Sequence, residues 1–437
     1  MTIRAFALVA VSCLAPGICL AQVPPVAMSS PPSVSLAGIS IPPVTPAGAM
    51  APPSAPAPDE PPVATTQRWV QWARLSGDWA SMRSSLASAG IRLSAGQMSD
   101  LSAVGRPGAD RRAFGWGLLD LNAAFDLDKM GGPKGGSAFV QYFVKAGGHG
   151  SRWLGDLQGF SNLDGDSFHH LYEAWYQQVL FRDRLRLKVG RVDANTEFAR
   201  VASAGEFIAP AAGLSPAIRT LPTYPNPALS VNAFFTPTPN VFLGAGVYDG
   251  SDPGDPASRA WATTFLIGES GATWKASGSS LPGRVAVGFW RHNGRFDDQQ
   301  DTGPSGDSGV YLVIEQAVWA AGKATDEGRP QVTLFAQYSR ANTRVEAIRD
   351  HLGFGVGWTG PFASRSDDAL GVYATWVSVP RSQGGLIQSE YSIGPFYKCQ
   401  VTPWLSVKPD VRYIRRPGAV EGRGSALAAT LRLRVDF

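Results

Sequence analysis

The chain has 437 residues, of which 44% are hydrophobic and 17% charged, with a formal net charge of +4 and a mean hydropathy of −0.06. This length fits two or three soluble domains or one large barrel, and the hydropathy is too polar for a bundle of membrane helices. The lysines and arginines are spread along the chain without a block, which argues against a nucleic-acid partner.

Residues 1–21 have the pattern of a secretory signal peptide. A positive residue precedes the apolar stretch 5–14, and small residues lie before a cleavage position after residue 21. A lipoprotein signal at Cys13 or Cys19 is the weaker alternative, because the residues around both cysteines fit that signal poorly. Cleavage leaves only Cys399, so no intramolecular disulfide is expected.

Residues 22–66 form a low-complexity segment. It holds 13 of the 34 prolines, and its only charged residues are Asp59 and Glu60. Such a composition cannot bury a core, and it predicts an extended, disordered tether in the periplasm.

Residues 67–90 have a different pattern. Apolar residues recur at helical spacing at Trp79, Met82, Leu86 and Ala89. Asp78 can cap the start and Gly90 follows the end. We expect a short amphipathic helix on the periplasmic side.

From Ile91 onward, apolar and polar residues alternate with a period of two, which is typical of strands. In the last segment one face is wholly apolar, made of Leu427, Ala429, Leu431, Leu433, Val435 and Phe437. The alternating segments run to about ten residues, long enough to cross a bilayer while tilted. Aromatic residues lie near the segment ends, where interface girdles belong.

About sixteen such segments fit between residues 91 and 437, if residues 261–274 are one long strand. An open sheet would leave unpaired backbone groups in lipid, so the sheet must close. The fold class predicted is all-β, a transmembrane antiparallel barrel with an aqueous lumen. Tight turns are expected at residues 237–240 and 401–403. Longer outer loops are expected at residues 250–258, 294–308 and 415–424.

Several separated motifs carry a family resemblance. They are residues 75–79, 170–178, 187–195, 403–405 and 408–414, with Phe437 at the end. With these motifs the chain resembles the carbohydrate-selective (OprB-type) porins of Gram-negative outer membranes over about residues 74–437. The resemblance implies a sixteen-stranded barrel in outer-membrane lipid that admits glucose and related small sugars by diffusion, without a cofactor. It also implies that barrel-assembly machinery reads Phe437.

Glu173, Trp175 and Gln177 share one face of a predicted strand, and Tyr172 and Tyr176 share the other. A carboxylate and an amide cannot sensibly face lipid, so the first face should be luminal. The Trp175 ring could then lie against a sugar, with hydroxyls bound by Glu173 and Gln177. Ordinary wall packing beneath an inward loop explains the same pattern equally well.

Arg184, Arg186 and Lys188 alternate on the next strand. A charge facing the lipid midplane costs roughly 2–4 kcal/mol, so this basic ladder should also be luminal. It could pair with Glu173 and narrow the pore. The alternative is a solvated channel wall that happens to be basic.

Residues 192–228 lose the alternation, and Asp193, Asn195 and Glu197 lie at their start. Long connections without regular structure are uncommon unless they are functional or disordered. We expect this one to fold into the lumen and form the constriction. The alternative is an extracellular cap.

An outer-membrane enzyme, of the barrel lipase or protease type, is the alternative function. Residues 306–309 superficially resemble a serine-protease nucleophile segment, but no motif supplies a paired His and Asp, and turn chemistry explains them. His169 and His170 lack a second ligand pair at metal spacing, so no metal site is expected. A structural anchor that works through the proline-rich tether is a third possibility.

Overall fold

The computed structural model describes residues 69–106, 111–251, 259–275, 281–296, 305–322, 329–380 and 388–437. The expected signal peptide (1–21) and proline-rich tether (22–66) lie outside these residues. Within the described part of the chain, no helix is both long and apolar enough to cross a membrane.

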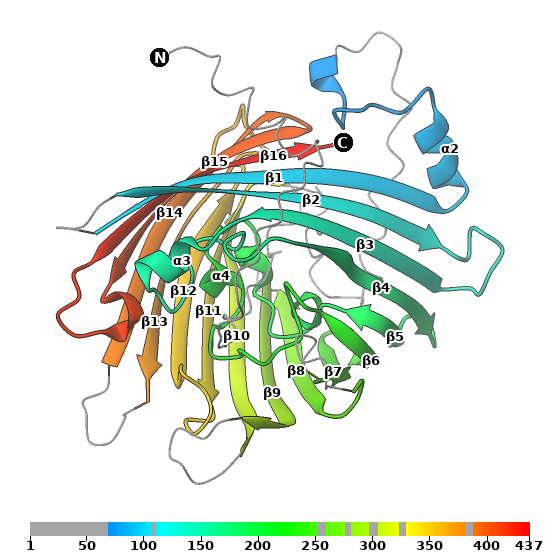
Figure 1. Ribbon diagram of the computed structural model, residues 1–437. Helices are drawn as coiled ribbons and strands as arrows, with labels where there is room; N and C mark the ends of the chain where they lie inside the picture. The colour runs from blue at the N-terminus through cyan, green and yellow to red at the C-terminus, as the bar shows by residue number, and fades with distance from the viewer. Residues whose placement is uncertain are drawn as a thin grey trace, which may run out of the picture. The chain divides into compact units, whose positions relative to one another are not determined.

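Sixteen antiparallel strands form one closed barrel, in which each strand pairs with its sequence neighbours and β1 pairs with β16 (Figure 1). The strands are β1 (Ile91–Gly105), β2 (Arg112–Asp126), β3 (Gly136–Gly147), β4 (Phe168–Leu180), β5 (Leu185–Val192), β6 (Ala228–Thr238), β7 (Val241–Asp249), β8 (Thr264–Lys275), β9 (Pro282–Phe296), β10 (Ser305–Ala320), β11 (Gln331–Ala341), β12 (Asp350–Thr359), β13 (Ala369–Val379), β14 (Gln388–Thr402), β15 (Leu405–Arg415) and β16 (Ala426–Asp436). Because the barrel is closed, no strand is left with an edge of unpaired backbone N–H and C=O groups. The predicted barrel of sixteen strands is confirmed.

The connections differ between the two rims. At the rim where β1 begins and β16 ends, here called the terminal rim, Pro239 and Asn240 join β6 to β7, and Pro403 and Trp404 join β14 to β15. The expected tight turns therefore exist, the second about one residue later than predicted. Longer connections lie at the opposite rim, here called the far rim. β8 begins only at Thr264, so the strand predicted from residue 261 is shorter than expected.

The helix predicted over residues 67–90 is wrong in extent. The segment contains η2 (Trp69–Gln71) and the seven-residue α2 (Met82–Ser88), and three consecutive left-handed residues at 79–81 separate them. Asp78 still acts near the helix start, since its carboxylate accepts a hydrogen bond from the backbone N of Ser84 at 2.9 Å. The rings of Trp69 and Trp404 stack 5.1 Å apart, which holds η2 against the β14–β15 turn.

The alternating residues of β16 form two different surfaces of the barrel wall. Leu427, Leu431 and Leu433 are exposed on the outside, where lipid covers them, whereas Thr430 and Arg432 are buried inside the barrel. The inside is not an empty cylinder, because two connections from the far rim fold into it.

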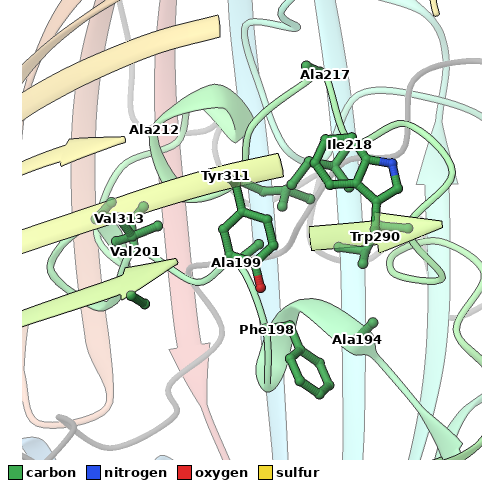
Figure 2. Close-up of a cluster of buried hydrophobic side chains, with 14 of the residues drawn as sticks. Ala194, Phe198, Ala199, Val201, Ala212, Ala217, Ile218, Trp290, Tyr311 and Val313 are labelled. Carbon is green, nitrogen blue, oxygen red and sulfur yellow. The ribbon is translucent and has the colours of Figure 1, made fainter. Parts of the chain in front are cut away.

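The first, here called the inner loop, comprises residues 193–227 between β5 and β6 and contains η3 (Ala194–Thr196), η4 (Ala202–Ala204) and α4 (Pro210–Gly213). Phe198 and Ile218 of this loop join the buried cluster that includes Trp290 of β9 and Tyr311 of β10 (Figure 2). The prediction that residues 192–228 fold inward is confirmed.

The second, here called the second inner segment, comprises residues 148–167 between β3 and β4 and contains α3 (Gly150–Leu154). Leu154, Phe160 and Leu163 are fully buried in a separate cluster with Phe143 of β3. α3 and α4 can be followed in Figure 1 among the strands. Another short helix, η5 (Pro417–Ala419), lies in the β15–β16 connection.

Candidate pore constriction

A β-bulge in β4 sets which side chains reach the lumen. Gln141 of β3 pairs with Glu173, but the next residue of β3 pairs with Leu171, so Tyr172 is the extra residue. A bulge re-aims the side chains of its strand. Tyr172 and Glu173 are consequently both buried inside the barrel. The expectation that Tyr172 lies on the outer face with Tyr176 is therefore wrong.

The polar residues at the bulge hold the start of the inner loop. Oε1 of Glu173 accepts a hydrogen bond from the backbone N of Asp193 at 2.9 Å. Tyr172 donates to one carboxylate oxygen of Asp193, and the other accepts from the backbone N of Asn195 at 2.8 Å. Three predicted site residues, Glu173, Asp193 and Asn195, thus come together, but as a buried anchor of the loop.

Trp175 is partly buried and is held from both neighbouring strands. Its ring stacks on Phe139 of β3 with centroids 5.3 Å apart, and Nζ of Lys188 of β5 lies 4.0 Å from its ring centroid. β5 passes very close at this point, since a Cβ at Gly190 would lie 2.3 Å from the carbonyl oxygen of Ala174. Only glycine fits there, so β5 can approach the backbone of Ala174 and Trp175 this closely.

Glu197 of the inner loop lies between two cations of β5. Arg186 donates to both carboxylate oxygens, at 3.0 and 2.6 Å, and Lys188 donates at 2.7 Å. Arg186 also donates to Oε1 of Gln177 at 3.0 Å. Burial alone would raise the pKa of Glu197, but Arg186 and Lys188 outweigh it and hold that pKa well below its usual range.

The predicted basic ladder is therefore only partly correct. Arg186 and Lys188 point into the barrel, as expected, but their partner is Glu197 rather than Glu173. Arg184 precedes β5 and is exposed in the turn at the terminal rim. It is not part of the ladder, because the strand that would direct it inward begins one residue later.

A second anchor of the same kind lies across the barrel. Nζ of Lys398 on β14 and Nζ of Lys408 on β15 donate to Glu206 at 3.0 and 2.6 Å, and Lys408 also reaches the backbone carbonyl of Glu206 at 2.7 Å. The two lysines hold the pKa of Glu206 well below its usual range, although burial opposes them. The sequence analysis missed this anchor, because its cations are distant in sequence from the loop.

Between the two anchors, charges on the wall bind the loop backbone. Glu269 of β8 accepts from the backbone N of Ala199 at 3.0 Å, and Glu315 of β10 accepts from the backbone N of Ser203 at 2.7 Å. Arg284 of β9 forms ion pairs with Glu269 and Glu315, at 2.9 and 3.2 Å. Residues 197–206 thus follow the wall from β5 through β10 and reach it again at β14 and β15.

The second inner segment is held differently, mainly through its neutral backbone. Glu390 of β14 accepts from the backbone N of Leu157 at 2.9 Å, from the side chain of Gln158 at 3.1 Å and from the backbone N of Gly418 at 2.7 Å. Arg412 of β15 donates to the carbonyl oxygen of Gly159. The wall supplies the charge in each of these contacts.

One of the two anchors of the inner loop remains open to the lumen, and the anchors of the second segment do not. At the first anchor the side chains of Glu197, Arg186 and Lys188 are only 9%, 11% and 3% exposed. The side chain of Glu206 is 38% exposed and that of Lys398 is 21% exposed. Glu390 is fully buried and Arg412 is 1% exposed. A passing solute can therefore meet the charges of the Glu206 anchor, whereas the charges of the Glu197 and Glu390 anchors are buried.

Comparisons with known proteins agree with this architecture. The chain is similar to Porin B of Pseudomonas aeruginosa, with 22% identity over 364 residues, covering 71% of this chain and 73% of that protein. It is also similar to the putative porin QuiX of Acinetobacter baylyi, with 23% identity over 422 residues, 84% of this chain and 93% of that protein.

The high-pH structure of Pseudomonas putida OprB aligns with a TM-score of 0.75 and 20% identity, covering 85% of this chain and 100% of that one. This likeness shows the shared fold. The model of the carbohydrate-selective porin family, OprB, matches residues 115–437. The chain is a sixteen-stranded outer-membrane barrel that belongs to the OprB family of carbohydrate-selective porins.

Proposed function

We propose that glucose and related small sugars diffuse passively along the inner loop, which narrows the lumen at residues 197–206. The observation that carries this proposal is the anchoring of the loop at both ends of this stretch, by Glu197 on β5 and Glu206 on β14 and β15. Between them, Arg200 and Ser203 are partly exposed. Guanidinium, ammonium and carboxylate groups can form hydrogen bonds with the hydroxyls of a sugar.

Trp175 is the aromatic group that we propose for contact with a sugar, through the part of its ring that Phe139 and Lys188 leave uncovered. It is partly exposed, its orientation is fixed by Phe139 and Lys188, and it lies on the strand that also anchors the loop. Asn122 of β2 is likewise partly exposed inside the barrel and adds an amide to this region. Of the predicted sugar contacts, Gln177 and Glu173 are buried, so we propose that they position the loop instead.

We infer passive transport rather than catalysis. Ser308, in the segment that resembles a protease nucleophile, is exposed on the outer wall, whereas His292 of β9, which pairs with Asp307, points inward and is buried. A hydrogen-bonded nucleophile and base cannot form across the wall. Among the described residues, no group of three His, Cys, Asp or Glu side chains is placed to hold a metal.

Single-channel recording in planar bilayers tests the sugar proposal. Glucose should reduce the ion current through the wild-type channel in a concentration-dependent way, and Trp175→Ala should weaken this block while the pore stays open. Phe362→Ala, which removes an exposed aromatic side chain at the terminal rim, is the matched control and should leave the block unchanged. A glucose block that is equal in all three proteins would reject Trp175 as a contact.

We also propose that barrel-assembly machinery recognises the terminal Phe437. This residue follows β16, and its backbone N donates to the carbonyl oxygen of Ala95 in β1 at 2.8 Å. Deleting Phe437 should reduce insertion into the outer membrane and leave export intact, measured by fractionation of the two membranes. Normal insertion of the deletion variant would refute this role.

A further inference from the structure

Two arginines lie on the lipid-facing side of the wall, near the far rim. Their immediate neighbours on the same strands are buried inside the barrel, namely Trp290 and His292 on β9 and Ser339 and Ala341 on β11. Arg291 and Arg340 therefore point outward. Arg291 is exposed, and the side chain of Arg340 is 58% exposed.

The register brings these two arginines to either side of one strand. Arg291 of β9 pairs with Ser308 of β10, and Arg340 of β11 pairs with Val310 of β10. Two strand spacings and an offset of two residues put their Cα atoms roughly 12 Å apart. Two extended guanidinium groups can meet over the exposed hydroxyl of Ser308, which lies between them.

Its acidic neighbour neutralises only part of the positive charge of this patch. Asp350 of β12 accepts from Nε of Arg349 at 2.5 Å and from the hydroxyl of Tyr338 at 3.0 Å, so its oxygens are already engaged. Arg340 forms a longer ion pair with Asp350, at 3.9 Å. Arg291 has no partner within the part of the chain that the structure describes.

On the same outer face, the residues that lie next to the arginines in the direction of the membrane midplane are apolar. Val287, Phe289 and Val310 are 52%, 58% and 51% exposed. The arginines thus border the hydrocarbon-facing surface, at the depth where lipid headgroups lie. A guanidinium at this depth is costly in hydrocarbon but is satisfied by a phosphate, to which it donates paired, charge-assisted hydrogen bonds.

We propose that Arg291 and Arg340 form a binding site for the phosphate of a phosphorylated glycolipid of the outer leaflet, with Val287, Phe289 and Val310 against its acyl chains. The far rim carries the longer connections, which in outer-membrane barrels face the outside, and the outer leaflet is where such glycolipids lie. The site is on the opposite side of the wall from the sugar path and does not depend on it.

Native mass spectrometry of the detergent-purified full chain tests the site with three probes: lipid A, enzymatically dephosphorylated lipid A and inorganic phosphate. Wild-type protein should retain lipid A, and Arg291→Gln with Arg340→Gln should bind it about tenfold more weakly. Arg182→Gln with Lys134→Gln removes the same charge from exposed turns at the terminal rim and should bind as wild type does. The single variant Arg291→Gln should show an intermediate loss.

Heat-modifiable migration and channel conductance of each variant show that the barrel is intact. Normal conductance with lost lipid A binding separates this site from the sugar path. Equal lipid A binding by the double variant and wild type would overturn the proposal. So would equal retention of the dephosphorylated lipid, which would mean that only the acyl chains bind, or displacement of lipid A by inorganic phosphate, which would mean a site for a free anion.

Discussion

The inner loop and the second inner segment both fill the barrel from the far rim, but the anchors at their ends differ. In the inner loop, Glu197 and Glu206 carry the charge and each lies between two cations of the wall. In the second segment the wall carries the charge, since Glu390 and Arg412 bind neutral backbone and amide groups.

This difference separates two tasks. Ion pairs that stay partly exposed influence any ion or solute in the lumen, because charge acts at a distance. Buried charges that bind neutral groups influence only the wall around them and the free energy of unfolding. We therefore expect changes in the second segment to alter stability, and changes at the exposed Glu206 anchor of the inner loop to alter selectivity.

The largest effect is expected where the second segment meets β1 and β16. Arg432 donates to Asp100 at 2.7 and 2.8 Å and to Oδ1 of Asn162 at 2.6 Å. Arg432→Met leaves Asp100 buried without its cation, which should cost about 3–5 kcal/mol of unfolding free energy. Urea titration followed by heat-modifiable gel migration measures this loss.

Two controls accompany that measurement. Arg182→Met, in an exposed turn, should unfold like wild type. Arg432→Met combined with Asp100→Leu removes both charges and should recover part of the loss, since no charge is left unpaired. If the single and double variants unfold at the same urea concentration, the burial of an unpaired carboxylate is not the cause.

A smaller effect, on selectivity alone, is expected at the exposed anchor. Glu206→Ala leaves Lys398 and Lys408 without their carboxylate, so the current should shift toward anions. The shift should be large at 0.1 M salt and fade at 1 M, as the Debye length falls from about 10 Å to about 3 Å. Reversal potentials across a salt gradient measure it. Glu421→Ala, which removes an exposed charge at the far rim, should show no shift; an equal shift there would indicate a general surface effect.

The smallest effect is a pH dependence at the far-rim end of the inner loop. Burial and the neighbouring Asp307 raise the pKa of Glu346 to about 8, against the ion pair with Arg219 at 3.2 Å. The pKa of Glu346 in the folded protein thus lies above its ordinary value of 4.5. The contribution of Glu346 to stability is therefore complete below pH 4.5 and is lost as the pH rises through about 8.

The loop contact made by Thr220 with Asp307, at 2.6 Å, should therefore weaken in mildly alkaline solution. Current noise should increase above pH 8 in the wild-type channel and stay constant in Glu346→Gln. Glu197 and Glu206, whose pKa values are held low, should not contribute in this range. An alkaline change that persists in Glu346→Gln would assign it to another group.

Features that depend on residues close in sequence could be predicted from the sequence, whereas contacts between distant residues could not. The barrel, its strand number and the inward course of the inner loop follow from alternation and its loss, which are local patterns. Glu197 lies close in sequence to Arg186 and Lys188, so the first anchor was within reach. Lys398 and Lys408 lie about two hundred residues from Glu206, and only the barrel closure brings them together.

Two errors have structural causes that alternation does not reveal. The bulge at Tyr172 shifts by one residue the alternation of inward and outward side chains along β4. The sequence around the bulge contains no glycine or proline to mark it. The second inner segment was not recognised, because its anchors are neutral backbone groups whose partners, such as Glu390 and Arg412, are on distant strands.

We propose that the two glutamate anchors hold the inner loop inside the lumen and thereby set the width of the pore. Single-channel conductance of Glu197→Ala with Glu206→Ala at 1 M KCl tests it most directly, because the short Debye length removes most of the effect of the lost charges. We predict a larger conductance than wild type and a weaker glucose block. A conductance and glucose block equal to those of wild type would contradict the claim.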